Sequence, residues 1–498
     1  MANNVQRHFT TSGDPAAPSV SGDTSVASPC GRAAARRCAA LPLVLALMGA
    51  AAVAAALVAG CDGAAQRFAS PAPPDSVTVL FSADNEGVLS SCGCSTSPAG
   101  GFARRQTVID DFRRARRSVV VVDAGDMFHD RPNTIKARYL AMALGRAGYD
   151  AVAMGTLDFE LGVDQVRSLA REYKLPFICA NVRDGSGGLV FPPHVVRQAG
   201  KMRVGIFAVI ADQAYGSPPR EWRKGLRVEP PIDAARREVR DLAGCDLIVA
   251  LSNQPLEKTR ALASGVAGIH VIVSGHDETV LRQPAVVEST MIVGTGAVGR
   301  LLGSLTVTRG PEGKPEMQME MMGLSAKVDE AKWVMGLYWE YVRKAKDEPP
   351  PEWNQMAVPD KYQAADACMH CHEAEYRQWE TTPHADAYAA LKKAGKQDDP
   401  ECLLCHTMGY GREGGFISME KTPELGRLTC QACHVVVATH GSKSGADPNA
   451  KLDVRSNVNS RLCMSCHGLI ESPDFDYITY RPKVVHGSPP PAKAPAQK

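Results

Sequence analysis

From residue 77 to about residue 325, short apolar runs alternate with amphipathic segments. Seven compact runs, rich in β-branched residues, end in polar residues or glycine, which is typical of strands. The predicted strands are residues 77–84, 118–126, 151–156, 176–182, 203–210, 246–252 and 270–276. Helical periodicity at 133–149 and 163–174 separates several of them, and a β-rich stretch at 290–309 closes the series. The pattern predicts a layered α/β domain, residues 76–325, whose strand ends carry the site.

The pattern changes after residue 325. Residues 329–348 have the period of a helix, and the prolines at 349–351 stop it, so residues 326–359 form a predicted linker. Residues 360–487 contain few aliphatic runs and cannot bury a core of their own, which predicts a mostly helical domain packed around another group. Residues 488–498 are rich in proline and predict a disordered tail.

An alanine-rich apolar run, residues 39–60, follows two arginines and ends in Ala-Gly-Cys at Cys61. Small residues before a cysteine resemble a bacterial lipobox, which would make Cys61 the lipidated first residue of the mature chain. A run of this length also suits a transmembrane anchor, but its composition and its end favour cleavage. Residues 1–61 are therefore predicted to be a signal segment and 62–75 a tether. Both interpretations place the rest outside the cytoplasm, as a periplasmic or cell-surface lipoprotein.

Four C-x-x-C-H motifs lie between residues 360 and 487. Two thiolates three residues apart can form thioethers to one porphyrin while the next histidine ligates its iron, so this spacing is typical of c-type haem attachment. Zinc ribbons also use C-x-x-C pairs, but they have no need of a histidine after each pair. We therefore predict four covalently attached haems. The motif residues are Cys368, Cys371 and His372; Cys402, Cys405 and His406; Cys430, Cys433 and His434; and Cys463, Cys466 and His467.

Each haem iron has a sixth position, and the candidates outside the motif histidines are His370, His384, His440 and His486. His370 lies inside the first motif, where its backbone is held beside the porphyrin edge, so it is not expected to ligate an iron. Three distal histidines thus remain for four irons.

The pattern W-x-x-T-x-H-A-x-A-Y around His384, the sequence CHTMGY after the second motif, and the late histidines resemble the tetrahaem c-type cytochrome that accepts electrons from hydroxylamine oxidoreductase. The resemblance implies stacked haem pairs. It also implies that His440 serves the first haem, His384 the third and His486 the fourth. The second haem then lacks a protein histidine, because Met408 is too close in sequence to His406 to reach the opposite face.

The predicted strand ends resemble the 5′-nucleotidase branch of the calcineurin-like metallophosphoesterases. In that family D-x-H, G-D, G-N-H-E, a lone His and G-H-x-H hold two metal ions that activate water for attack on phosphorus. This chain reads S-A-D-N-E-G, D-A-G-D, M-G-T-L-D-F-E, L-S-N-Q and S-G-H-D-E at the matching places. Asp84, Asp126 and His276 are retained.

The other positions have changed. Thr156 replaces an asparagine ligand, Leu157 replaces the catalytic histidine and Asn253 replaces the lone histidine. Glu86 replaces a histidine and Glu278 stands at the final position. The oxygen ligands Asp84, Glu86, Asp126 and Glu278 suit one Mg²⁺, Mn²⁺ or Ca²⁺ better than zinc. We therefore expect at most one divalent cation and little nucleotidase activity; alternatively, these acids only cap strand ends.

Cys92 and Cys94 lie in a glycine-rich loop after the first predicted strand. In an oxidising compartment the pair is a reducible disulfide, a soft metal ligand pair or two idle thiols, and the sequence leaves these three open. Cys179 and Cys245 lie in apolar strand contexts typical of inert core thiols.

The formal net charge is +2 over 498 residues, and the six arginines between Arg104 and Arg117 fall on one predicted amphipathic helix. We interpret them as a solvated helix face, so no nucleic-acid partner is expected. The favoured function is electron transfer by a membrane-anchored tetrahaem cytochrome with redox donor and acceptor proteins as partners. The alternative is an extracytoplasmic phosphoesterase, or a redox enzyme that uses the open second haem or the Cys92 and Cys94 pair.

Overall fold

A computed structural model describes most of the chain between residues 68 and 486. The described ranges are residues 68–91, 99–128, 133–212, 225–277, 279–310, 314–347, 362–434, 459–468, 472 and 474–486. The predictions for Cys61, Cys92, Cys94, Glu278 and His440 fall outside these ranges and stay predictions. Within the ranges, no helix has the length and apolar character needed to cross a membrane.

The first sheet has six strands in the order β14-β13-β1-β2-β3-β4. Its parallel strands are β1 (Val77–Ser82), β2 (Val119–Asp123), β3 (Ala151–Ala153) and β4 (Phe177–Ile178). Two antiparallel strands complete it at the other edge, β13 (Leu301–Arg309) and β14 (Pro315–Gly323). The parallel strands bring the residues after β1, β2 and β3 to one edge of the sheet.

The second sheet has the order β11-β12-β10-β9-β7-β6. Four strands are parallel: β7 (Met202–Ile210), β9 (Leu247–Asn253), β10 (Val271–Gly275) and β12 (Thr290–Gly294). The antiparallel edge strands are β6 (His194–Ala199) and β11 (Ala285–Val287). A separate pair joins β5 (Val182–Arg183) to β8 (Arg227–Val228).

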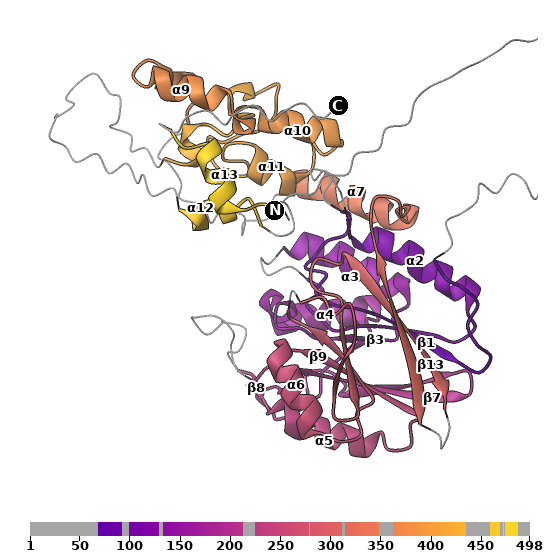
Figure 1. Cartoon of the computed structure of the whole chain (residues 1–498). Helices are drawn as coiled ribbons and strands as arrows, with labels where there is room; N and C mark the ends of the chain where they lie inside the picture. Colours follow the sequence, from indigo (N-terminus) through magenta and orange to yellow (C-terminus); the bar gives the residue numbers. More distant parts are fainter. Residues whose placement is uncertain are drawn as a thin grey trace, which may run out of the picture. The chain divides into compact units, whose positions relative to one another are not determined.

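Helices cover the outer face of each sheet, so the domain has four layers (Figure 1). Over the first sheet lie α2 (Phe102–Ala115), α3 (Thr134–Ala147), α4 (Val163–Tyr173) and α7 (Lys332–Asp347). Over the second lie α5 (Pro231–Asp241) and α6 (Leu256–Gly265). The alternation along β1 builds the layers: Val79 and Phe81 enter the core between the sheets, whereas Leu80 packs beneath the helices. The predicted layered α/β domain is confirmed.

Short helices make up the described part of the haem-motif region. They are α8 (Asp366–Met369), α9 (Glu373–Glu380), η5 (Pro383–Asp386), α10 (Ala387–Ala394), α11 (Pro400–His406), η6 (Pro423–Leu425), η7 (Cys430–Ala432), α12 (Ser460–Met464), α13 (Tyr477–Tyr480) and η8 (Arg481–Lys483). Two small apolar clusters serve this region, one around Leu391 and Leu403 and one around Tyr376 and Trp379. Each is far smaller than the cores of the α/β domain.

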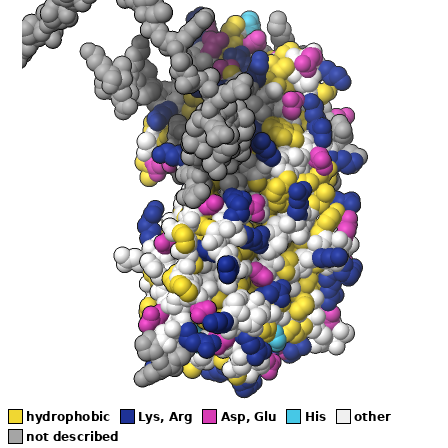
Figure 2. Space-filling model, turned by 90° about the vertical axis from the view of Figure 1, so that its right-hand side faces the viewer, with side chains coloured by type: hydrophobic (Ala, Val, Ile, Leu, Met, Phe, Trp, Pro, Cys, Tyr) yellow, Lys and Arg dark blue, Asp and Glu magenta, His cyan; other side chains and the backbone are white. Residues whose placement is uncertain are grey.

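The arginine-rich helix α2 does not have the solvated face that its sequence predicted. Arg104, Arg105 and Arg116 are buried, and only part of the set reaches solvent. Arg105 is fully buried because it pairs with Asp123, which removes the cost of an isolated charge. Figure 2 shows Lys and Arg side chains spread over one face of the molecule, interspersed with other residue types.

Candidate functional site

The retained acids and the histidine sit on sharp turns at the carboxyl ends of β1, β2 and β10. Asp84, Glu86, Asp126 and His276 have φ of 49°, 49°, 55° and 59°, the left-handed conformation that side-chain-bearing residues seldom adopt. Four such residues at neighbouring strand ends turn the chain sharply enough to bring their side chains together. The structure therefore places Asp84, Asp126 and His276 in one cluster.

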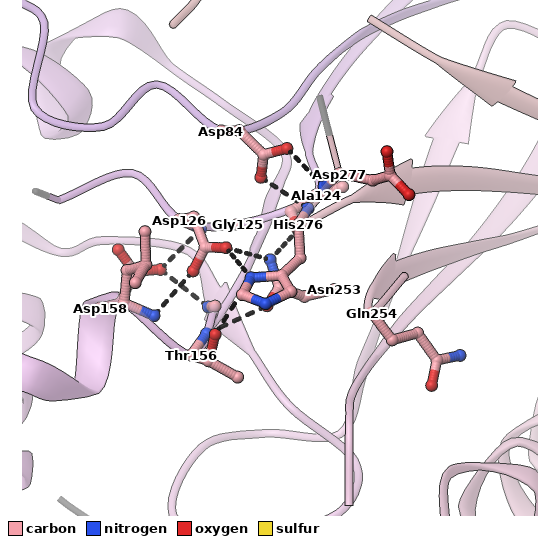
Figure 3. Close-up of polar contacts among 12 residues, drawn as sticks. Asp84, Ala124, Gly125, Asp126, Thr156, Asp158, Asn253, Gln254, His276 and Asp277 are labelled. Atoms are coloured by element: carbon pink, nitrogen blue, oxygen red, sulfur yellow. Dashed lines mark hydrogen bonds and ion pairs between the residues drawn. The ribbon is translucent and has the colours of Figure 1, made fainter. Parts of the chain in front are cut away.

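Asp126 is the centre of this strand-end cluster (Figure 3). One carboxylate oxygen accepts from the backbone N–H of Leu157 at 2.8 Å. The other accepts from the Asn253 amide at 3.0 Å and lies 2.7 Å from Nδ1 of His276. The same ring nitrogen is 3.2 Å from Oγ1 of Thr156. Gly155 beneath it must be glycine, because a Cβ there would lie 2.1 Å from an Asp126 oxygen.

Asp84 and Asp158 close the cluster on either side. Asp84 accepts from the backbone N–H of His276 at 2.7 Å, and burial, followed by the nearby Asp126, raises its pKa well above the usual range. Asp158 accepts from the N–H groups of Asp126 at 3.1 Å and Phe128 at 2.8 Å. Burial and then Asp126 raise the pKa of Asp158 as well. The sequence pattern did not identify Asp158, although it stands two residues after Thr156 in M-G-T-L-D-F-E.

A fully buried arginine supports the loop that carries Asp84. Nη1 of Arg105 lies 3.3 Å from both Ser82 Oγ and an Asp123 oxygen, and Nη2 donates to Asn85 Oδ1 at 2.8 Å. Neither the guanidinium nor the Asp123 carboxylate is exposed. Because Asn85 stands between Asp84 and Glu86, Arg105 holds this turn from inside the core.

The described residues do not fit a two-metal centre. None of the described His, Cys, Asp and Glu side chains form a group of three that could hold a metal ion. The oxygens of Asp126 and Asp84 already accept hydrogen bonds from protein donors, and two family ligands are Thr156 and Asn253, which are weaker donors. Glu278 lies outside the described residues, so a single cation there stays a prediction.

The haem motifs present their histidines in a way that suits a porphyrin iron. In α11, Nδ1 of His406 lies 2.7 Å from the carbonyl oxygen of Ala387, so the ring donates there and keeps Nε2 for a metal. In the fourth motif, Nδ1 of His467 is 2.9 Å from Ser472 Oγ. The hydrogen bonds at Nδ1 fix the orientation of both rings, as is usual for metal-binding histidines.

Two motif histidines each face a histidine from a distant part of the chain. The ring centres of His384 and His467 are 6.1 Å apart, and those of His434 and His486 are also 6.1 Å apart. Two imidazoles on opposite sides of one iron have ring centres about 6 Å apart, given metal–nitrogen bonds of about 2 Å. The ring-centre separation of both pairs is that of two such ligands, with interplanar angles of 52° and 13°.

These pairs differ from the ligand assignment that the resemblance implied, and the ligation itself stays a prediction. His384 faces the fourth motif, not the third, and His486 faces the third motif, not the fourth. His384 lies in η5, the short helix between α9 and α10. His440 lies outside the described residues. Met408 is buried in the apolar cluster with Leu391.

The electrostatic neighbours of the motif residues give the order of the motifs in space. The thiols of Cys368 and Cys430 share a hydrogen bond that lowers the pKa of Cys368 to about 7 and raises that of Cys430, so the first motif adjoins the third. Burial, with Cys463 and Cys466 nearby, raises the pKa of Cys433 to about 11, which places the fourth motif next to the third.

The second motif adjoins the fourth. Burial, followed by the charge of the nearby His406, lowers the pKa of His467. The motifs thus follow the spatial order first, third, fourth, second. A group bound at each would have a neighbour within the same small region, which is what stepwise electron transfer needs.

Comparison with known proteins separates the two regions. Residues 367–435, which hold the first three motifs, match the family model described as "Cytochrome c554 and c-prime". The α/β domain is similar to 5′-nucleotidases, with 29% identity to the Bos taurus enzyme and 30% to the Homo sapiens enzyme, each over 204 residues. These matches cover 39% of this chain and 35% of each relative, so the chain spans about a third of the length of the curated relatives.

Two solved structures are also similar. The 5′-nucleotidase precursor of Thermus thermophilus has a TM-score of 0.49 and 21% identity, covering 64% of this chain and 68% of that one. The calcineurin-like phosphoesterase YfkN of Bacillus subtilis has a TM-score of 0.46 and 18% identity, covering 55% and 98%. At these values the similarity supports no statement about function.

Proposed function

We propose that this protein is an extracytoplasmic, lipid-anchored electron-transfer protein with four c-type haems, which carries a 5′-nucleotidase-like domain of little or no hydrolytic activity. Its partners are a redox donor and a redox acceptor protein, and Cys61 is its membrane anchor. The observation that supports this most strongly is the facing of His384 with His467 and of His434 with His486 at 6.1 Å.

The residues around the motifs have clear tasks in this function. A bound haem supplies the one-electron couple of its iron, whose potential depends on axial ligands, burial and nearby charge. His384 with His467, and His434 with His486, would each hold one haem iron in this function. Burial, followed by the neighbouring imidazoles of His486 and His372, lowers the pKa of His434, which favours the neutral ring that a metal ligand needs. Because the motifs adjoin one another in the order first, third, fourth, second, electrons could pass between neighbouring haems along the whole series.

The test is expression of the full chain in a host with c-type haem maturation. We expect the mass to rise by four haems and the oxidised protein to give bis-histidine low-spin spectra plus one minority high-spin signal from the second haem. Replacement of Cys61 by alanine is expected to release the protein from the membrane fraction. An unshifted mass, or zinc at the motifs, would overturn the proposal.

A second function, phosphoester hydrolysis, is favoured by the similarity to 5′-nucleotidases alone. The strand-end cluster argues against it, because Leu157 replaces the family's catalytic histidine and the Asp126 oxygens are already hydrogen-bonded. With Mg²⁺ or Mn²⁺, the full chain is expected to hydrolyse AMP and aryl phosphates barely above the metal-only rate. Ready turnover that Asp126→Ala abolishes would instead make hydrolysis the main activity.

A further inference from the structure

The helix that carries the second haem motif begins at a buried acid. Asp399 is the N-cap of α11 and accepts from the backbone N–H of Glu401 at 3.1 Å. It is 4% exposed, and the helix it caps contains Cys402, Cys405 and His406. A charge at this position is therefore within one short helix of both thioether positions and of the iron ligand.

A phenol and an ammonium group hold the other side of Asp399. The Tyr338 hydroxyl, from α7, donates to the carboxylate. Lys396, 9% exposed, donates from Nζ to the Tyr338 oxygen at 2.5 Å, and the ammonium also lies 4.0 Å from the centre of that ring. A further contact joins it to Ser90 Oγ at 3.4 Å, in the loop after β1. A carboxyl group and an ammonium group are thus buried together and linked through Tyr338. Burial, followed by Glu401, raises the pKa of Asp399, whereas Lys396 and the Tyr338 hydroxyl oppose that shift.

A second ion pair joins the same helix to the α/β domain. Nζ of Lys136, on α3, lies 2.8 Å from a carboxylate oxygen of Glu401, with side-chain exposures of 10% and 33%. The junction therefore holds α11 from α3 and from α7. Because Lys136 and Tyr338 lie outside the haem-motif region, the resemblance of that region to other cytochromes does not imply this set of charges.

We propose that Asp399 and Lys396 are positioning residues that set the reduction potential of the second haem, so that the α/β domain tunes this haem through its junction. The inference rests on the proposed function. Its basis is that both charged groups are buried, where charges interact far more strongly than in water. Cys402 is also near, since burial, then Asp399, then Cys402 are among the causes that raise the pKa of Tyr338.

The two charges act in opposite directions. A nearby carboxylate stabilises the more positive ferric state, and a nearby ammonium destabilises it. Removal of the carboxylate should raise the potential and removal of the ammonium should lower it. A purely structural role would not produce opposite shifts from adjacent residues.

The experiment is a spectroelectrochemical titration of the full-length haem protein, following the high-spin signal of the second haem. Asp399→Asn is expected to shift its midpoint upward; asparagine caps helices as well as aspartate, so α11 keeps its start. Lys396→Met is expected to shift it downward. The matched control is Asp398→Asn, which removes an acid one residue away whose ion pair with Lys346 is more than half exposed and screened by solvent.

The outcomes are distinct. Opposite shifts in the two variants, with no shift in Asp398→Asn and no change in the other three haems, support the proposal. Shifts of the same sign, equal shifts in the control, or no shift would overturn it. Failure of the proposed function looks different, because the unmodified protein would then lack four haems or lack the high-spin signal altogether.

Discussion

The strand-end cluster and the haem-motif region use their polar atoms in opposite ways. Around Asp126, oxygens accept from an amide, a ring and a backbone N–H, so the groups satisfy one another. Around the haem motifs, His406 and His467 use Nδ1 for a protein contact and leave Nε2 for another partner. The Asp126 oxygens are thus paired with protein groups, whereas His406 and His467 are each oriented by one ring nitrogen and keep the other for a further partner.

The largest effect is expected when the haem attachment sites are removed. Replacing all eight motif cysteines with serine is expected to leave residues 360–487 without a sufficient core, because the two apolar clusters there are small. Limited proteolysis followed by mass measurement should show this region digested while residues 76–325 persist. Cys245→Ser is the control, and a resistant haem-motif region in the eightfold variant would contradict the expectation.

The next effect concerns the internal support of the strand-end cluster. Arg105→Met removes one partner of a fully buried ion pair and leaves the Asp123 charge in the core, which costs about 3–5 kcal/mol in the free energy of unfolding. Denaturant unfolding followed by circular dichroism measures it. Arg138→Met, at an exposed pair with Glu172, should cost less than about 1 kcal/mol. Equal losses in both would mean that Arg105 does not support the fold.

A third test sharpens the histidine pairing. His384→Ala should convert one low-spin haem to high spin, as should His486→Ala. In a background that lacks the fourth haem through Cys463→Ser and Cys466→Ser, only His486→Ala should still have this effect, because His384 faces His467. Electron paramagnetic resonance of the oxidised proteins measures it. The reverse result would restore the pairing implied by family resemblance.

The smallest effect concerns His270, a half-buried histidine of the α/β domain. Burial lowers the pKa of His270, whose Nδ1 accepts from the backbone N–H of Ile248 at 3.0 Å and is therefore neutral. In the unfolded chain His270 is protonated below about pH 6.5, whereas the folded protein takes up this proton only at a lower pH. The free energy of unfolding therefore has its full value above about pH 6.5 and decreases as the pH falls toward the folded-state pKa of His270. His270→Asn should make the loss of unfolding free energy below about pH 6.5 shallower. An unchanged slope would contradict this.

The strands of the α/β domain could be predicted because their apolar runs are long and end at polar residues. The run at 176–182 was the exception: it is divided into β4 and β5, since buried Asn181 turns its amide to the backbone of Ile210. The edge strand β14 was not predicted, because its alternating methionines and charged residues lack β-branched side chains.

Residue types at the site could be predicted, but their partners could not. The buried state of Arg105, on α2, depends on Asp123 at the end of β2, and no local pattern reveals that contact. His384 lies near His467, 83 residues further along the chain, and no local pattern reveals which motif it reaches. The spacing of the motifs predicts which residues could bind haem, but the packing of the chain decides which distant histidine lies near each motif.

The contact between Cys368 and Cys430 has a consequence for biogenesis. These thiols belong to different motifs, share a hydrogen bond, and one has a pKa of about 7, so a reactive thiolate lies beside a second sulfur. In the extracytoplasmic location proposed above, an oxidant of that compartment would join them in a disulfide and disable two attachment sites at once. We therefore expect maturation to depend on a reductant that acts before the haems arrive, and the order of these two events to limit the yield of complete protein.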